Sequence, residues 1–341
     1  MPVPVYSEKD SGPYITMGVT ISKDPETGAR NMGIYRHELK GKNRLGISAQ
    51  ELYRHLAKAE AKDSDLPVAI ALGVDPALII GACWKAPYGI DEISIAGGFR
   101  GAPVQMVKAE TSDLEVPATA EIVIEGIVLP NVRETEGPFG EYAGYYNPPK
   151  PKPVIEVTAI THRCDPIFLA GLTGMPTTEN HILKQVCLEA SYGWELKQKF
   201  AGFRAVHLPA AGSHGLLAII SMRPMSKSEA RHVITYMLGN RPSLKCVIVV
   251  DDDVDIHNIE QVMWTVMTRF QPARDVMVVS DLIPAALDPS GPRGVASDGV
   301  EGSDVDASAI GIDATRPYGK PFPEVVRIPG VERVPDLVKR A

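Results

Sequence analysis

The first half of the chain alternates apolar and polar positions with a period of two. The run 14–21 is rich in β-branched residues, and a second run, from Asn31 to about Leu39, would alternate its faces. Such alternation is typical of strands that bury one face. Shorter β-rich runs separated by turns follow between Val104 and Leu129. Many short strands at this spacing predict a barrel-like sheet that ends near residue 160.

One helix is expected inside this sheet region. The apolar residues Leu52, Leu56 and Ala59 recur at helical spacing, and Ser48 stands three residues before Glu51 in the pattern of a capping box. We therefore expect a helix over about 49–62 that begins with this capping box.

Beyond Thr161 the apolar period changes from two to about 3.6. Helices are expected over 181–200 and from a second capping box at 226–229 to Asn240, and the run 244–250 is typical of a strand buried on both faces. A further helix is indicated by an apolar stripe, which consists of Ile259, Val262, Met263, Val266, Met267 and Phe270. Helix, strand and helix in this order predict an α/β layer after a domain boundary near residue 162.

The fold class is therefore mixed α/β, in three predicted regions. Residues 1–161 form the barrel-like domain, 162–290 form the α/β domain, and 291–341 form a C-terminal loop and tail. The stretch 288–313 is dense in Gly, Pro, Ser and Asp, so we expect one long loop there, ordered by contacts within an oligomer.

Composition narrows the possible functions. The chain has 341 residues, of which 44% are hydrophobic, and its net charge of −7 comes without a cluster of Lys and Arg, which argues against nucleic-acid binding. The four cysteines show no paired spacing, so a disulfide framework or a zinc site is not expected. No targeting segment and no apolar run of about 20 residues is present, so we predict a cytoplasmic protein without a membrane span.

The stretch 136–146, EGPFGEYAGYY, carries the strongest chemistry. It places Glu136 and Glu141 on either side of a Gly-Pro-Phe-Gly turn that lets the backbone bend sharply. Two carboxylates crowded into one cavity favour keeping one of them protonated near neutral pH, as a general acid requires. Taken alone, the string equally describes a solvated hairpin with acidic flanks.

A second acidic run, 251–255 (DDDVD), follows the predicted buried strand 244–250. It lacks the glycine and the terminal glutamate of a calcium-binding loop. A turn at the end of the strand, with a cap for the next helix, is the expected structure.

The combined motifs are similar to those of the UbiD family of decarboxylases, which use prenylated FMN. Besides EGPFGE, the matching segments in family order are NMGIYR at 31–36, ALGVDP at 71–76, DLEVPA at 113–118, AEIVIEG at 120–126, DDD at 251–253 and GIDAT at 311–315. The resemblance extends from about Pro13 to Thr315. It implies a split β-barrel of the flavin-reductase-like type followed by an α/β domain.

The resemblance also implies roles for particular residues. Arg36, Glu136 and Glu141 match the family's Glu-Arg-Glu network, in which the second acid delivers the proton that replaces carbon dioxide. Arg36 would hold Glu136 as an anion by a bidentate contact and orient the substrate carboxylate, which leaves Glu141 to carry the proton. A buried structural ion pair is the alternative for these residues.

The cofactor contacts follow in the same way. Ile34, Tyr35 and Arg36 would contact the flavin, whereas Asn31 and Glu92 would ligate a divalent metal, usually manganese, that anchors the cofactor phosphate. Potassium is a further candidate ion. Gln50-Glu51 occupies the place where some members have a glutamine followed by a metal-binding histidine, so Glu51 is either a third ligand or only part of the capping box.

Three departures from the family bear on the function. Glu51 replaces that histidine, and Ala309 stands where many members have a lysine that reaches the cofactor phosphate. The chain also begins close to the strand that leads into Asn31, so most of the usual N-terminal region, about a hundred residues, is not in this sequence. These departures are what an accessory subunit of a multi-subunit carboxylase would show.

The prediction is therefore a reversible decarboxylase of an aromatic or α,β-unsaturated carboxylic acid, a carboxy-lyase that uses prenylated FMN and Mn²⁺. A separate flavin prenyltransferase would supply the cofactor, and a homo-oligomer or a partner subunit is expected. The alternative is a non-catalytic or accessory UbiD-like subunit.

Overall fold

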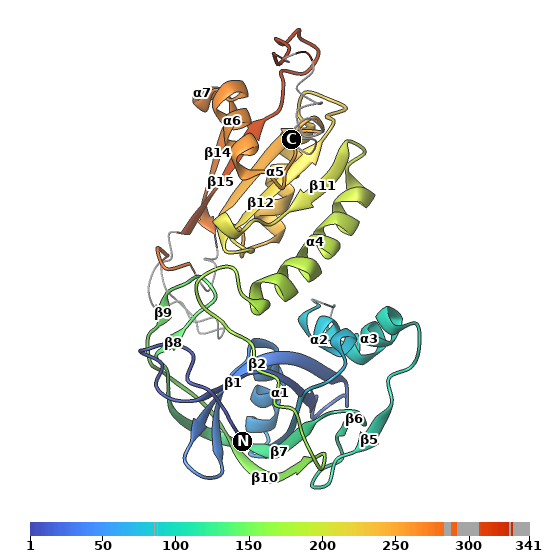
Figure 1. Ribbon diagram of the computed structural model, residues 1–341, viewed down its shortest axis with the longest axis vertical. Helices are drawn as coiled ribbons and strands as arrows, with labels where there is room; N and C mark the ends of the chain where they lie inside the picture. The colour runs from blue at the N-terminus through green and yellow to red at the C-terminus, as the bar shows by residue number, and fades with distance from the viewer. Residues whose placement is uncertain (85, 87, 283–287, 292–306, 327–328, 330–341) are drawn as a thin grey trace, which may run out of the picture.

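The structure is a computed structural model that describes residues 1–84, 86, 88–282, 288–291, 307–326 and 329. It has two parts, a β-barrel in the first half of the chain and an α/β unit in the second (Figure 1). Both parts, and their order, were predicted from the sequence. None of the helices in the described part of the chain combines the length and the hydrophobicity that crossing a membrane requires.

The barrel is closed by six antiparallel strands in the order β1-β2-β3-β10-β7-β4. Their bounds are Tyr14–Lys23 for β1, Arg30–Lys40 for β2, Arg44–Ser48 for β3, Leu66–Leu72 for β4, Ile122–Glu136 for β7 and Lys150–His162 for β10. Closure leaves no strand of the barrel with an unpaired edge, and the predicted strands over 14–21 and 31–39 are thereby confirmed.

The two faces of β4 pack on different helices. In β4 the even-numbered residues Val68 and Ile70 join the cluster around Leu52 and Leu56 of α1 (Gln50–Glu60). The odd-numbered Ala69 and Ala71 pack on α2 (Pro76–Cys83) and α3 (Glu92–Arg100). A period of two therefore buries both faces of this strand.

The predicted capping boxes are wrong. Helix α1 begins after Ala49, which makes no side-chain cap, because Ser48 is still the last residue of β3. Helix α5 (Glu229–Asn240) begins after Ser228, also without a side-chain cap, and the Glu229 carboxylate instead accepts the backbone N–H of Gly202 at 3.0 Å. A sequence pattern can locate the start of a helix, but it does not show which hydrogen-bond partners the side chains at that start have.

The short elements of the first half lie between the long barrel strands. A two-stranded sheet joins β5 (Met106–Lys108) to β6 (Glu115–Pro117), and a second joins β8 (Phe139–Gly140) to β9 (Tyr146–Asn147). The last barrel strand, β10, ends at His162, and the chain then crosses to α4 (Glu179–Lys199).

The α/β unit is a five-stranded sheet in the order β11-β12-β13-β15-β14. The strands are β11 (Phe203–His207), β12 (Leu217–Met222), β13 (Cys246–Asp251), β14 (Val276–Leu282) and β15 (Ala307–Ala314). Strands β12, β13 and β15 run parallel, while β11 and β14 are antiparallel edges.

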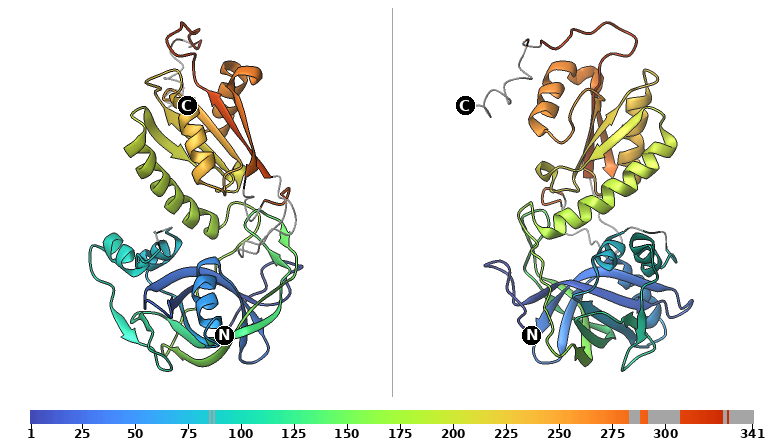
Figure 2. Two further views of the ribbon diagram at one scale, coloured as in Figure 1. Left: turned by 180° about the vertical axis from the view of Figure 1, so that it is seen from behind. Right: turned by 45° about the vertical axis from the view of Figure 1, so that its right-hand side comes forward.

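Helices cover both faces of this sheet. Helices α4 and α5 pack on one face, against Val247 and Val249 of β13. Helix α6 (Ile259–Arg269) packs on the other, against Ile248 and Val250, and the short α7 (Pro272–Asp275) follows it (Figure 2). The predicted strand buried on both faces is confirmed.

Two expectations for the second half are wrong. The stripe of α6 is narrower than predicted, because Met263 and Met267 are exposed while Val262 and Val266 are buried. The stretch 288–313 is not one loop, because 307–314 form β15, which pairs between β13 and β14. The α/β sheet therefore includes residues beyond 290, where the sequence analysis ended the α/β domain. Residues 292–306 of that stretch lie outside the described residues.

Candidate active site

A cavity of about 810 Å³ lies between the barrel and the α/β unit. Strand β2 contributes Asn31, Ile34, Tyr35 and Arg36 to its wall. Further lining residues come from α3, from the end of β7 with the turn after it, and from the start of α4. They are Glu92, Glu136, Phe139, Glu141, Tyr142, Asn180, Leu183 and Lys184. The space is large enough for a cofactor of flavin size.

Arg36 stands between two carboxylates on this wall. Its Nε lies 2.8 Å from Glu136 Oε1 and its Nη2 lies 3.0 Å from Glu136 Oε2, so the guanidinium donates two hydrogen bonds to one acid. Its Nη1 donates to Oε1 of Glu141. The same guanidinium lies 5.0 Å above the ring of Phe139. The structure thus brings together the three residues that the sequence analysis named as a network.

The turn between the two acids is fastened at several points. Glu136 is the last residue of β7, and Gly137 takes φ +90°, a backbone conformation that favours glycine. The N–H of Gly140 donates to Asp10 Oδ1 at 2.8 Å, and the N–H of Glu141 donates to the carbonyl of Tyr145 at 2.9 Å. The two carboxylates are therefore held in place by the backbone rather than presented on a mobile hairpin.

Burial and charge act together at this cluster. Glu136 is 2% exposed and Glu141 is 9% exposed. Burial alone would lower the pKa of Arg36, but the negative charges of Glu141 and Glu136 raise it overall, so the guanidinium stays charged. Glu136 receives two N–H donors from Arg36, whereas Glu141 receives one from Arg36 and one from the backbone N–H of Tyr142 at 3.0 Å.

Asn31 and Glu92 meet at another part of the cavity wall. Glu92 Oε2 accepts the backbone N–H of Met32 at 3.0 Å, which places this carboxylate beside Asn31. Asn31 Nδ2 donates to the hydroxyl of Tyr35 at 3.2 Å, so Asn31 and Tyr35 share a face of β2, as strand alternation predicts. The Asp91 side chain caps α3 by accepting the N–H of Ile93, and this fixes the helix start that carries Glu92.

These two residues fit a divalent metal only as part of a ligand set. An amide oxygen and a carboxylate are suitable donors for a hard cation. Within the described residues, no three His, Cys, Asp or Glu side chains gather as a metal site. The side chains of Gln50 and Glu51, the remaining candidates, lie outside the described residues.

Ala309 does not face the cavity. It lies in β15, is 5% exposed and belongs to the hydrophobic core beneath α5. The described residues that line the cavity do not include it. The expectation that this position reaches a cofactor phosphate is therefore wrong, and Ala309 is no sign of a lost cofactor site.

Sequence reasoning missed several cavity residues. Lys150 and Lys152 of β10 and Lys184 of α4 line the cavity, and the Lys184 Nζ lies 3.8 Å from the centre of the Tyr142 ring. These lysines come from distant segments, and no local spacing in the sequence marks them as neighbours of Arg36. Only the closure of the barrel against α4 brings them together.

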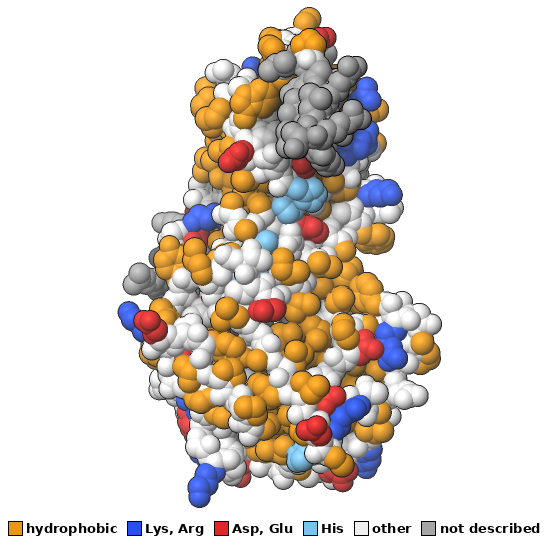
Figure 3. All heavy atoms as spheres, viewed as in Figure 1, with side chains coloured by type: hydrophobic (Ala, Val, Ile, Leu, Met, Phe, Trp, Pro, Cys, Tyr) orange, Lys and Arg blue, Asp and Glu red, His pale blue; other side chains and the backbone are white. Residues whose placement is uncertain are grey.

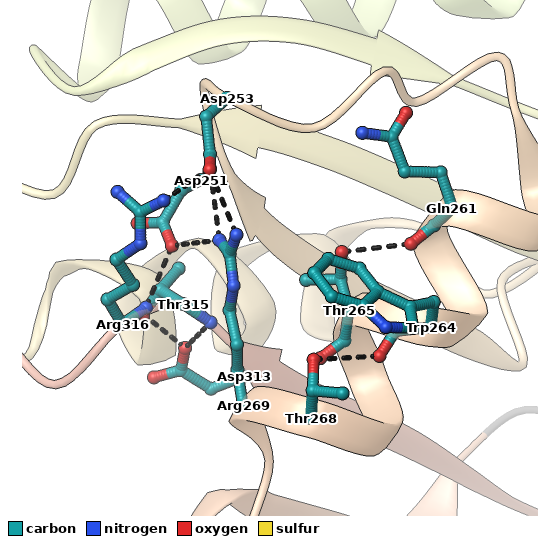
Figure 4. A network of polar contacts seen from close by, with 10 residues as sticks. All are labelled: Asp251, Asp253, Gln261, Trp264, Thr265, Thr268, Arg269, Asp313, Thr315 and Arg316. Carbon is teal, nitrogen blue, oxygen red and sulfur yellow. Dashed lines mark hydrogen bonds and ion pairs between the residues drawn. The ribbon is translucent and has the colours of Figure 1, made fainter. Parts of the chain in front are cut away.

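The acidic run 251–255 forms a second arginine cluster at the ends of β13 and β15 (Figure 4). Arg269 Nη1 lies 2.7 Å from Asp251 Oδ2 and 2.9 Å from Asp253 Oδ1, and Arg316 also pairs with Asp253. The predicted turn at the strand end is confirmed. The predicted helix cap is wrong, because Asn258 caps α6 by accepting the N–H of Gln261.

The fold and the site together define a two-part α/β protein whose central cavity carries an arginine between two acids. The family model for the 3-octaprenyl-4-hydroxybenzoate carboxy-lyase Rift-related domain matches residues 1–176, and the model for the C-terminal domain of the same enzyme matches 183–314. The chain therefore belongs to the UbiD family, as its motifs predicted.

Individual relatives agree with this assignment. Phenolic acid decarboxylase of Bacillus subtilis is 37% identical over 300 residues, which are 85% of this chain and 63% of that protein. The UbiD-class enzyme HmfF from Pelotomaculum thermopropionicum in complex with FMN is 39% identical, with a TM-score of 0.89 over 98% of this chain and 74% of that one. An evolved dimeric form of HmfF in complex with prFMN is 38% identical, with a TM-score of 0.84 over 98% and 72% of the two chains. The chain spans about two thirds of the length of the curated relatives it matches.

Proposed function

We propose that the protein is a reversible, non-oxidative decarboxylase of an aromatic or α,β-unsaturated carboxylic acid that uses prenylated FMN. The observation that carries the proposal is Arg36, held between Glu136 and Glu141 on the wall of a cavity of about 810 Å³. The phenolic acid decarboxylase of Bacillus subtilis and the HmfF complexes with FMN and prFMN support it.

The three residues of the cluster have different roles in this proposal. The bidentate contact from Arg36 keeps Glu136 ionised, because two charge-assisted hydrogen bonds favour the anion. Glu141 carries the proton that replaces carbon dioxide on the substrate carbon. Arg36 lines the cavity beside both acids, so it also orients the substrate carboxylate.

The cofactor residues follow from the same cavity. Prenylated FMN, when bound, supplies the electron sink for the charge left behind when carbon dioxide departs. Ile34, Tyr35 and Arg36 of β2 line the cavity and would contact the flavin. Asn31 and Glu92 also line it and would hold a divalent metal such as Mn²⁺ that anchors the cofactor phosphate. Glu51 would be a further ligand. K⁺ is a second candidate ion, and Gln50 is a further proposed cofactor contact.

The cluster also bears on the choice between an enzyme and an accessory subunit. A subunit kept only for assembly has no need of a buried arginine and two acids that line a cavity, since such groups cost desolvation energy. The Arg36, Glu136 and Glu141 set therefore favours the catalyst. The enzyme would depend on a flavin prenyltransferase for its cofactor.

Subunit contacts are also proposed. Apolar side chains gather on the face shown in Figure 3, over the barrel half in particular. Helix α4 exposes Val186 at 52% and Trp194 at 70% of their surfaces. Apolar exposure of this extent is typical of surfaces that meet another subunit.

Purification under anaerobic conditions, from cells that also express a flavin prenyltransferase, tests the proposal. Mass spectrometry and an absorption spectrum of the released small molecule should show prenylated flavin in near-stoichiometric amount. The Glu92→Gln variant serves as control, because it keeps the size of the side chain and weakens the proposed metal contact, so it should retain less flavin. A colourless wild-type protein without flavin would favour the accessory subunit.

A further inference from the structure

We propose that His181 is a positioning residue that holds the proton donor Glu141 in place through the backbone of Tyr142. The proposal rests on the proposed function, because it assigns His181 a part in the same proton transfer. His181 lies in the first turn of α4, outside the barrel that carries Arg36 and Glu136. No motif in the sequence pointed to it.

The hydrogen bonds of His181 assign its protons. Its Nδ1 lies 3.1 Å from the backbone N of Thr178, and a backbone N–H can only donate, so Nδ1 is the acceptor. The Thr178 hydroxyl lies 2.8 Å from the same Nδ1 and can donate to it as well. The ring proton is therefore on Nε2, which lies 2.7 Å from the carbonyl oxygen of Tyr142 and donates to it. One neutral tautomer satisfies all three contacts.

Tyr142, whose carbonyl accepts from His181, is also the residue that binds the carboxylate of Glu141. The N–H of Tyr142 donates to Glu141 Oε2 at 3.0 Å. The backbone of Tyr142 therefore links α4 to the proton donor. Its carbonyl accepts a hydrogen bond from His181 of α4, and its N–H donates one to Glu141. The Tyr142 ring also stacks on the imidazole, with centroids 4.5 Å apart and an interplanar angle of 24°.

The surroundings favour the neutral imidazole. The His181 side chain is fully buried, and burial lowers its pKa. The hydrogen bond to the Tyr142 carbonyl acts against this, while His214 and Lys184 lower the pKa further. The His214 ring lies 5.5 Å away, and Lys184 lies on the same helix. A proton on Nδ1 would face the N–H of Thr178, so protonation breaks this backbone contact and leaves only the Thr178 hydroxyl to accept from Nδ1.

This arrangement ties the acid to both halves of the molecule. Arg36 reaches Glu141 from β2 of the barrel, and His181 reaches the next residue from the α/β unit. The proton donor is therefore in position only when α4 is seated against the turn after β7.

A pair of variants tests the role. In His181→Leu the donor to Tyr142 is lost, and we expect kcat to fall by about 30-fold with KM and flavin content within about threefold of wild type. In His181→Gln the side-chain amide can still donate to that carbonyl, so it should recover most of the rate. The control is His214→Gln. This buried histidine bonds to the carbonyl of Leu208 at 2.9 Å and packs beside the His181 ring, but none of its hydrogen bonds within the described residues reaches Tyr142 or Glu141. Its kcat should therefore stay near wild type at a comparable loss of stability.

A double-mutant cycle separates positioning from a general structural effect. If His181 acts through Glu141, adding His181→Leu to Glu141→Asp should lower kcat by less than about threefold, because the donor is already displaced. A full 30-fold drop in that background would overturn the proposal. Wild-type protein that carries prenylated flavin but converts no acid would instead overturn the proposed function, and the role of His181 with it.

The tautomer gives a readout that does not depend on turnover. Nitrogen NMR of protein labelled with ¹⁵N-histidine should show, for the resonance missing in His181→Gln, a proton on Nε2 and none on Nδ1 near pH 7. An imidazolium or an Nδ1–H tautomer at that pH would contradict the proposal even if His181→Leu did not fold.

Discussion

Two clusters in which an arginine is held by two acids, one around Arg36 and one around Arg269, differ in what surrounds them. Arg36 with Glu136 and Glu141 lines the large cavity between the two halves. Arg269 with Asp251 and Asp253 closes a turn at the end of β13. The arginine side chain is 15% exposed in the first cluster and 2% in the second.

The difference is one of space rather than of residue type. In the Arg269 cluster, Asp251 also accepts the N–H of Arg316 at 2.8 Å, and the Arg316 side chain pairs with Asp253. Arg269 lies on a smaller pocket, but neither Asp251 nor Asp253 lines it. In the Arg36 cluster, both acids line a cavity that can hold a substrate. An ion cluster whose acids line a cavity can take part in chemistry, whereas the Arg269 cluster at the strand end stabilises the fold.

The largest expected effect is at Glu141. Glu141→Gln keeps the size of the side chain and removes the transferable proton, so kcat should fall by about 10³-fold while flavin stays bound. Rates normalised to flavin content by absorption measure this. An unchanged kcat would show that Glu141 is not the proton donor.

A smaller loss is expected for Arg36→Lys. Lysine keeps the charge but not the fork that binds Glu136 through two N–H groups, so kcat/KM should fall by about 10²-fold. Steady-state kinetics at saturating and limiting substrate give the value. A variant with wild-type kcat/KM would show that charge alone suffices.

The Arg269 cluster should respond in stability and not in rate. Arg269→Met leaves two acids without their main partner, and we expect a loss of about 2 kcal/mol in the free energy of unfolding, less than for a fully buried pair because Asp253 is partly exposed. Urea unfolding measures the loss, and kcat of the folded protein should stay unchanged. A large fall in kcat at full flavin content would contradict the purely structural role of the Arg269 cluster.

The last prediction concerns acid stability in the barrel. His37 neighbours Arg36 in β2 and is fully buried, and burial lowers its pKa to about 3. The unfolded chain takes up a proton below about pH 6.5 that the folded chain refuses, so stability falls as pH drops from about 6.5 to 3, by up to about 1.4 kcal/mol per pH unit. His37→Gln should flatten this slope in urea titrations at several pH values, and an unaltered slope would assign the acid sensitivity to other groups.

Local patterns predicted most of the fold. Alternation located β1 and β2, a continuous apolar run located β13, and helical spacing located α1, α4, α5 and α6. The pattern failed at β15, because Gly and Asp residues that are typical of loops lie in a strand shielded by β13 and β14. Tertiary pairing overrides composition at such positions.

The candidate site was predictable only in part. Arg36, Glu136 and Glu141 stand in motifs, so their meeting could be expected from a resemblance to the family. His181 and Lys184 could not, because their place depends on how α4 docks against the turn after β7. Ala309 was misjudged for the same reason, since the sequence does not show whether a position faces a cavity or a core.

The most direct test of the account is a decarboxylation assay in D₂O. Protein loaded with prenylated flavin is incubated anaerobically with a panel of aromatic and α,β-unsaturated carboxylic acids, and the products are examined by NMR. The account predicts release of carbon dioxide from at least one acid, with a single deuterium on the carbon that held the carboxylate. Loaded protein that leaves every acid unchanged, or a product without deuterium at that carbon, would contradict it.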